Sequence, residues 1–448
     1  MGETPYFKGE TLGLAPNSPD RLTHTKTPKH DCTTARMHEC TKARRHETVY
    51  HLPMRKTRLF TPGPTPLMPE AQLAMSRPLV HHRTPQFTEL FLETRRNLQK
   101  IFRTENDVVI LTSSGTGAME AAVSNLLSPD DPALAVVTGK FGERWVKICQ
   151  SHGVPCTSLE KKYGEAASAE EICAALEHNP EIRAVLIQGC ETSTATSHDL
   201  EAIAQQIGSK FPKVFIVVDA ITALLTQPLE TDQWGLDIVI SGSQKSFALS
   251  PGLSFLTLSP RAIAKIKTNS SRSYYFDLLQ EVNQQRKGQC AFTPAISLIM
   301  GLHETTREIL RQTPERVLAD AELMARSTRK GLRALGFRIL SSSPASAVTA
   351  AIPPDGVAAA ELAKKLEAEF GLKVAGGQGA LKNKIVRIAH LGYFDLLDVF
   401  LVLSAIELCL TKMGTQVDLG SSVRAAMIEA VGRQEHTSDP KSSIHETS

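Results

Sequence analysis

Short, continuous apolar runs alternate with helical segments from residue 58 onward, and this alternation restricts the fold more than any other feature of the chain. Segments with apolar residues at helical spacing separate most of the runs. Strands that lack polar alternation are buried on both faces, as in parallel sheets covered by helices on both sides. The pattern therefore predicts a doubly wound α/β domain. Its expected parallel strands are residues 107–112, 133–138, 184–188, 214–218 and 237–240, and residues 255–258 are expected to join them as an antiparallel strand.

The pattern changes after about residue 300. A long helix is predicted over residues 314–335, and further helices over 357–370 and 396–413. Strands are predicted over residues 337–340, 347–352, 372–375 and 385–389. We therefore expect a large domain over residues 54–300 with an N-terminal segment, a smaller α+β domain over 301–414, and a polar tail over 415–448.

Residues 1–53 differ from the rest, since they hold five of the 14 histidines and few apolar residues. An eight-residue repeat begins at His30, His38 and His46. Cysteine and histidine at short intervals can bind zinc, but this spacing matches no zinc pattern, and we predict no metal site. A disordered extension, or sequence upstream of a start at Met54, is the simpler interpretation. Deletion of residues 1–53 is then expected to leave folding and activity intact.

The charge balance argues against whole classes of protein. Fifty basic and 47 acidic residues give a net charge of +3, too small for a nucleic-acid or membrane-surface protein. The eight cysteines show no framework spacing and follow no secretory signal. No apolar run reaches the roughly 18 residues of a membrane span. We expect a cytoplasmic enzyme of small molecules that binds neither nucleic acid nor membrane.

Two of the predicted strands are followed by residues suited to binding an anion or a cation. Residues 112–117 (TSSGTG) join a strand to a helix, and a helix N-terminus with a nearby glycine binds anions. A plain Ser/Thr N-cap is the alternative. Asp219 ends the run 214–218, where a buried carboxylate needs a cation or a donor. It could also cap a helix.

Two basic residues complete the set. Lys245 follows the strand 237–240, and a desolvated lysine becomes a nucleophile that forms imines, whereas a solvated lysine would not. Arg387 lies inside an apolar strand, so it must pair with an anion, either a substrate carboxylate or a protein acid. An anion site, a carboxylate for a pyridinium nitrogen, an imine-forming lysine and a carboxylate-binding arginine are the parts of a pyridoxal phosphate site.

Seven segments carry a resemblance to a known family: TPGPTP (61–66), HHRTPQF (81–87), SGTG (114–117), ETST (191–194), VDA (218–220), SGSQK (241–245) and VRI (386–388). Over about residues 58–413 the chain resembles the class V aminotransferases of fold type I, in particular the alanine–glyoxylate and serine–pyruvate group. The resemblance implies the cofactor pyridoxal 5′-phosphate, the two-domain fold, and a homodimer with each site at the interface.

The resemblance also implies a role for each matching residue. Lys245 would form the imine and move protons, Asp219 would pair with the pyridine nitrogen, and Arg387 would bind the substrate carboxylate. The remaining cofactor contacts would be Ser114, Gly115, Thr116 and Gln244 at the phosphate, Phe141 stacked on the ring in place of the usual tryptophan, Ser193 near the 3′-oxygen, and Thr293 reaching a partner chain's phosphate.

The implied reaction is transamination between alanine or serine and glyoxylate or pyruvate. Cys190 and Ala195 stand where glycine is usual, which bears on substrate preference. A 2-aminoethylphosphonate-type aminotransferase stays open, as does a non-catalytic subunit with this fold. A lyase or desulfurase would need a mobile cysteine, and the loop 376–379 contains none.

Overall fold

The computed structural model describes residues 56–269 and 273–432. The expectations for residues 1–53, including the histidine repeat and the zinc alternative, lie outside these residues.

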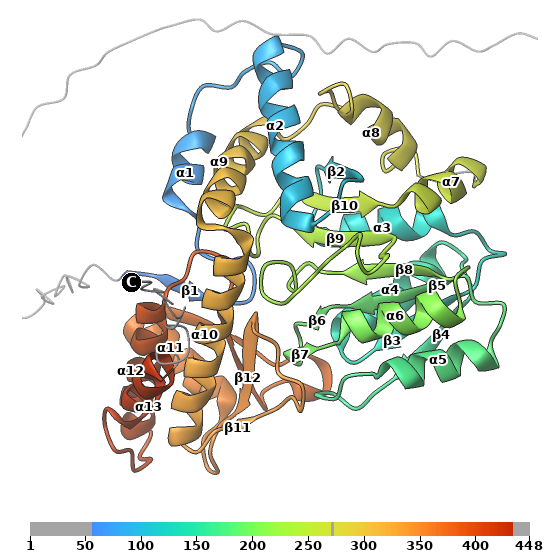
Figure 1. Cartoon of the computed structure of the whole chain (residues 1–448). Helices are drawn as coiled ribbons and strands as arrows, with labels where there is room; N and C mark the ends of the chain where they lie inside the picture. Colours follow the sequence, from blue (N-terminus) through green and yellow to red (C-terminus); the bar gives the residue numbers. More distant parts are fainter. Residues whose placement is uncertain (1–55, 270–272, 433–448) are drawn as a thin grey trace, which may run out of the picture. The chain divides into compact units, whose positions relative to one another are not determined.

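The large sheet has seven strands in the order β2-β10-β9-β8-β5-β3-β4 (Figure 1). Every neighbouring pair is parallel except the two that involve β10, which confirms the predicted mostly parallel sheet. The predicted antiparallel strand lies inside the sheet, between β9 and β2, and β2 forms the edge. The strands are β2 (Asp107–Leu111), β3 (Ala133–Val137), β4 (Cys156–Glu160), β5 (Ala184–Gln188), β8 (Phe215–Asp219), β9 (Ile238–Gly242) and β10 (Ser254–Leu258).

Helices cover both faces of this sheet, which explains its unbroken apolar runs. Successive residues of a strand point to opposite faces. In β3, Leu134 and Val136 belong to one core cluster, and Ala133 and Ala135 belong to the other. The first cluster also contains side chains of α2 (Pro85–Phe102), α5 (Ala169–His178), α6 (Leu200–Lys210) and α9 (Ile296–Gln312). The second contains side chains of α3 (Gly115–Leu126), α4 (Lys140–Ser151), α7 (Pro260–Thr268) and α8 (Leu278–Gln285).

The smaller sheet has five strands in the order β1-β13-β14-β12-β11. They are β1 (Arg58–Phe60), β11 (Arg338–Ile339), β12 (Val348–Ile352), β13 (Leu372–Gly376) and β14 (Val386–Ala389). One face packs on a third core formed with α10 (Pro314–Ala334), α11 (Ala359–Phe370), α12 (Leu396–Lys412) and α13 (Ser421–Val431). The other face contributes residues such as Val348 and Ala350 to the first core of the large sheet.

Two expectations about the domain limits are wrong. The N-terminal segment does not belong wholly to the large domain, because β1 pairs in parallel with β13, with Leu59 opposite Lys373. Residues 415–448 are not simply a polar tail, because α13 packs along α10 and buries Ala426 in the third core. Val423 and Ala426, three residues apart, lie on the side of α13 that faces this core, whereas Met427, Ile428 and Val431 are exposed.

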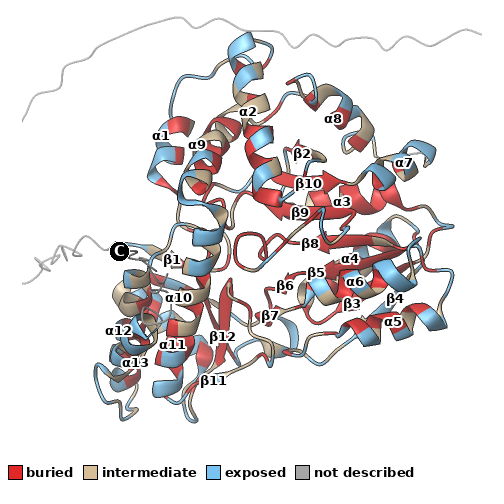
Figure 2. Ribbon diagram, in the orientation of Figure 1, coloured by how far each residue is buried: buried red, intermediate tan, exposed pale blue. Residues whose placement is uncertain are grey.

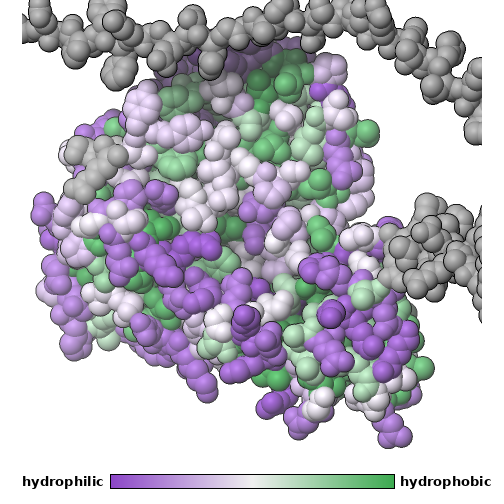
Figure 3. Space-filling model, turned by 180° about the vertical axis from the view of Figure 1, so that it is seen from behind, coloured by the Kyte–Doolittle hydropathy of each residue, from purple (hydrophilic) through white to green (hydrophobic). Residues whose placement is uncertain are grey.

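The remaining elements are α1 (Pro69–Met75), the short hairpin β6 (Cys190–Glu191) and β7 (Thr196–Ser197), and the 3₁₀ turn Gly379–Leu381. Buried residues follow the strands of both sheets and the inner sides of the helices (Figure 2). Seen from behind, hydrophilic residues dominate the lower half of the surface, and hydrophobic residues gather toward the top (Figure 3). Among the described residues, no helix is both long and apolar enough to cross a membrane.

Candidate functional site

The large sheet brings the predicted site residues together at the carboxyl ends of its strands, where open α/β sheets bind ligands. Asp219 is the last residue of β8, and β9 ends at Gly242, three residues before Lys245. Gly115 begins α3, four residues after β2 ends. A Cβ atom on Gly242 would lie 3.7 Å from the backbone nitrogen of Gly115, so the turns after β9 and β2 touch.

Lys245 lies in a tight enclosure. Its amine donates to the backbone carbonyl of Pro62, and its own carbonyl accepts from the Thr65 hydroxyl at 3.0 Å. Gly63 has φ +142°, and a Cβ atom there would lie 2.5 Å from Nζ of Lys245, so only glycine fits at this position. Burial lowers the pKa of Lys245 to about 8. A substantial fraction of the amine is therefore neutral and nucleophilic near physiological pH.

Asp219 is buried and forms no ion pair with any residue that the structure describes. Its Oδ1 accepts from the backbone N–H of Ile221 at 2.9 Å, so the carboxylate ends β8 and begins the following turn. Burial, with a smaller contribution from Glu191, raises the pKa of Asp219 to about 6, and Arg144 and Lys245 oppose the increase. A buried carboxylate that remains largely charged at neutral pH is suited to a cationic ring nitrogen.

An anion can be bound at the N-terminus of α3. Ser114 is the N-cap residue, but its side chain makes no capping bond, so the first N–H groups of the helix lack a side-chain acceptor. A Cβ atom on Gly115 would collide with Ile221 at 2.4 Å. The buried Oε1 of Gln244 has no hydrogen-bond partner in the protein. Because an amide can be turned to present its NH₂ group instead, Gln244 is free to donate to a bound phosphate.

A network around Glu191 holds the aromatic ring expected to stack on a cofactor. The Oε2 atom of Glu191 accepts from the backbone N–H groups of Phe141 and Gly142, both at 3.0 Å. Its Oε1 accepts from the Ser193 hydroxyl at 2.5 Å. Glu191 thus caps α4, and burial raises its pKa. The Ser193 hydroxyl also accepts from the backbone N–H of Lys140 at 3.0 Å, so Ser193 braces the Phe141 turn. Its predicted contact with the cofactor oxygen stays a prediction.

Arg387 reaches across from the small sheet. Its neighbours Val386 and Ile388 face the third core, so Arg387 points toward the large domain. Its Nε atom donates to the carbonyl of Gly376 and its Nη1 atom to the carbonyl of Thr192, both at 2.9 Å. No carboxylate of the described chain forms an ion pair with it, so the structural salt bridge considered as the alternative is absent there. The guanidinium keeps its capacity for an external carboxylate.

Thr293 is not brought to this cluster. Its side chain is exposed, and with Phe292, Tyr275 and Thr112 it lines a small cavity of about 20 Å³. Its predicted contact belongs to a partner chain and stays a prediction.

Sequence reasoning missed three features of the cluster. Glu191 lies inside the ETST motif (191–194), and its carboxylate follows a buried strand, as that of Asp219 does. Arg144 lies three residues after Phe141 in the turn that begins α4. The Pro62 carbonyl that accepts from Lys245 left no signal in the sequence, because it is 183 residues away.

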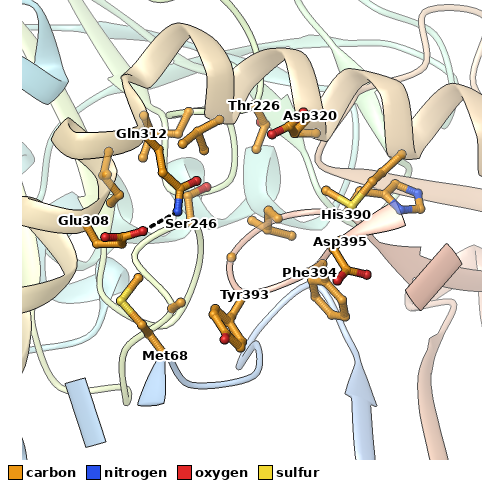
Figure 4. A pocket seen from close by; sticks show the side chains of 18 residues that line it. Met68, Thr226, Ser246, Glu308, Gln312, Asp320, His390, Tyr393, Phe394 and Asp395 are labelled. Atoms are coloured by element: carbon orange, nitrogen blue, oxygen red, sulfur yellow. Dashed lines mark hydrogen bonds between the residues drawn. The ribbon is translucent and has the colours of Figure 1, made fainter. Parts of the chain in front are cut away.

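A separate cavity of about 270 Å³ is lined by residues of α9, α10 and the loop 390–395, and by Ser246 (Figure 4). Its carboxylates are already engaged: Glu308 accepts from Gln312 at 2.6 Å and pairs with Arg311, and Asp395 caps α12. Neither Lys245 nor Arg387 lines it. This cavity is therefore separate from the residues predicted to form the site, here called the strand-end cluster: Gly115, Asp219, Gln244, Lys245 and Arg387.

The strand-end cluster fits pyridoxal phosphate. The unpartnered Gln244 oxygen and the open helix terminus suit the phosphate, the isolated Asp219 suits the ring nitrogen, and Lys245 lies among them. Arg387 then remains for a substrate carboxylate.

Comparisons with known proteins agree with this arrangement. Residues 70–392 match the profile of a family described as Aminotransferase class-V. The soluble hydrogenase 42 kDa subunit of Anabaena cylindrica is 35% identical, over 83% of this chain and 98% of that protein. The L-aspartate–glyoxylate aminotransferase of Paracoccus denitrificans is 30% identical, over 82% and 94%. The structure of an aspartate aminotransferase of subgroup IV from Thermus thermophilus is similar with a TM-score of 0.75 and 35% identity, over 80% and 99%.

Proposed function

We propose that this chain, which belongs to the class V aminotransferase family, transfers the amino group of alanine or serine to glyoxylate or pyruvate. The observation that carries this proposal is Arg387, a buried cation that faces the domain holding Lys245 and Asp219 and forms no ion pair with a carboxylate of the described residues. The family's cofactor, pyridoxal 5′-phosphate, supplies an electron sink for the carbon that loses a proton.

The protein's own groups would divide the work of proton transfer and orientation. Lys245, with its pKa lowered to about 8, would take the proton from Cα of the substrate and deliver it to the reacting carbon of the cofactor. Asp219 would hold the ring nitrogen protonated from within a buried environment. Arg387 would orient the substrate through a bidentate bond to its carboxylate. Ser114, Gly115, Thr116 and Gln244 would hold the phosphate, and Phe141 would stack on the ring.

The charges around the cluster favour substrates with one carboxylate. Lys140 lies next to Phe141, but its ammonium pairs with Glu143 at 2.5 Å. Arg144 donates to Thr116 at 2.9 Å, at the N-terminus of α3 that is proposed to hold the phosphate. Arg387 is therefore the cation best placed to receive a substrate carboxylate. A second carboxylate at Lys140 would have to displace the ion pair with Glu143, which supports alanine or serine over aspartate.

A desulfurase-type reaction has little support among the described residues. Cys190 lies close enough to Lys245 for each to affect the pKa of the other. Burial raises the pKa of this thiol strongly, so it stays protonated and is a poor nucleophile.

We also propose that the chain acts as a homodimer. Thr293 and Tyr274 are exposed, and the rings of Tyr274 and Tyr275 lie 5.5 and 5.2 Å from that of Phe292. Such an aromatic cluster suits an interface with a second copy, which would let Thr293 reach the phosphate of its partner. Light scattering coupled to size exclusion should give a mass near twice 48.8 kDa.

A screen of amino donors against acceptors tests the function. Purified protein with pyridoxal phosphate is offered alanine, serine, aspartate and 2-aminoethylphosphonate, each with glyoxylate, pyruvate or 2-oxoglutarate. Turnover should be highest with alanine or serine and glyoxylate or pyruvate. Lys245→Ala should abolish turnover and the visible absorbance of the bound cofactor. A preference for aspartate or the phosphonate would overturn the substrate assignment, and a colourless, inactive wild-type protein would favour a non-catalytic subunit.

A further inference from the structure

Arg144 joins the two parts of the cluster that would hold the cofactor. Its guanidinium carbon lies 4.7 Å from the centroid of the Phe141 ring, over its face. Its Nη1 atom lies 2.9 Å from Oγ1 of Thr116, in the first turn of α3. No carboxylate within residues 56–269 and 273–432 forms an ion pair with it. A half-buried arginine so placed has positive charge to spare for an external anion.

The bond to Thr116 determines which way that hydroxyl points. A guanidinium can only donate, so the Thr116 oxygen accepts and its own proton must donate elsewhere. No bond from this hydroxyl to another described residue is present, while the N–H groups that begin α3 lie beside it. An anion at this helix terminus would therefore accept hydrogen bonds from the Thr116 hydroxyl and from the backbone N–H groups.

The contact with Phe141 determines which face of that ring is available. A phenyl ring has two faces, and the guanidinium of Arg144 covers one of them. A cofactor ring that stacks on Phe141 must use the other face. Arg144 thus supports the stacking ring from behind, in addition to its bond with Thr116.

We infer that Arg144 is a positioning residue for the cofactor, which orients the Thr116 hydroxyl toward the phosphate, supports the ring of Phe141, and supplies the fixed positive charge of this subsite. This inference rests on the proposed function, because it needs pyridoxal phosphate as the ligand. The charge of Arg144 also reaches the reacting groups, since it lowers the pKa values of both Asp219 and Lys245.

Titration of the cofactor-free protein with pyridoxal phosphate tests the pathway through Thr116. Arg144→Met and Thr116→Val should each weaken binding by about tenfold or more, because each removes a charge-assisted contact. The double variant should bind about as weakly as the weaker single variant, since both remove one shared interaction. Lys147→Met removes a charge from an exposed position of the same helix and should leave binding unchanged. Unchanged binding by Arg144→Met, or additive losses in the double variant, would overturn the inference.

A pH profile separates the charge of Arg144 from a purely structural effect. The rate of cofactor capture should rise with pH as Lys245 loses its proton, with a midpoint near its pKa of about 8. Because Arg144 lowers that pKa, Arg144→Met should move the midpoint to higher pH, and Arg144→Lys should restore it. An unmoved midpoint contradicts the inference.

Should Arg144→Met fail to fold by circular dichroism, Arg144→Gln tests the same loss of charge. A wild-type protein that binds no pyridoxal phosphate refutes the proposed function itself, whereas normal wild-type binding with unaffected variants refutes only this inference.

Discussion

Lys245→Met should stabilise the cofactor-free protein, because the native state holds this amine where it is poorly solvated. Its pKa is lowered from 10.5 to about 8. Well below pH 8 the amine is protonated in both the folded and the unfolded states, and burial of the charge costs the folded state about 3 kcal/mol by the usual conversion. Loss of the hydrogen bond to Pro62 offsets about 1 kcal/mol of the gain. We expect the variant to be more stable by about 2 kcal/mol at pH 7.

The sign of the pH dependence makes this prediction specific. Between pH 8 and 10.5 the unfolded chain holds the proton that the folded chain has released, so wild-type stability rises with pH relative to the variant. Urea unfolding of both cofactor-free proteins at several pH values from about 7 to 10.5 measures the difference. It should change by about 3 kcal/mol over this range. Lys147→Met, at an exposed position, should show no such trend. A difference between Lys245→Met and wild type that does not vary with pH would refute the reasoning.

Further predictions follow from the same cluster. Glu191→Ala removes the acceptor of three buried backbone N–H groups and should lower the free energy of unfolding by about 3–5 kcal/mol, measured in urea; a loss under about 1 kcal/mol would show that the cap is not needed. Arg387→Lys keeps the charge but loses the planar guanidinium that binds a carboxylate through two N–H groups. The KM for the amino donor should therefore rise about tenfold or more, while the affinity for pyridoxal phosphate stays unchanged. Weakened cofactor binding would contradict the assignment. Gly63→Ala places a Cβ atom 2.5 Å from Nζ of Lys245 and should slow cofactor capture at least about tenfold, whereas Gly208→Ala, with nothing within 4 Å of the new atom, should not.

The sequence predicted six of the seven strands of the large sheet because those strands are almost wholly buried. The edge strand β4 is largely exposed, has no continuous apolar run, and was not predicted. A strand with alternating polar and apolar residues would have fitted a sheet with one solvated face. Unbroken runs such as residues 184–188 instead indicate a strand between two layers of helices. The placement of β1 was not readable. Its three residues pair with β13, more than 300 positions later, and nothing local to residues 58–60 encodes that partner.

The sequence predicted those site residues whose charged side chain closely follows an apolar strand. Asp219 and Lys245 are of this kind, and both lie in the cluster at the strand ends. Arg144 was not readable in this way, because an arginine on a helix of mixed polarity looks like any solvated residue. Its bond to Thr116 forms only because α3 and α4 lie beside each other in the folded chain.

The bond from Arg387 to the carbonyl of Thr192 has a thermodynamic consequence. The group expected to grip the substrate is also a strut between the two domains, so the orientation of the small domain and the occupancy of the carboxylate subsite are linked functions. A substrate bound to this arginine would favour the orientation of the small domain in which Arg387 also contacts Thr192. By linkage, a change that disfavours this orientation would weaken substrate binding by the factor by which the substrate stabilises it. Affinity for a one-carboxylate ligand would then report on how firmly the small domain is held at Thr192.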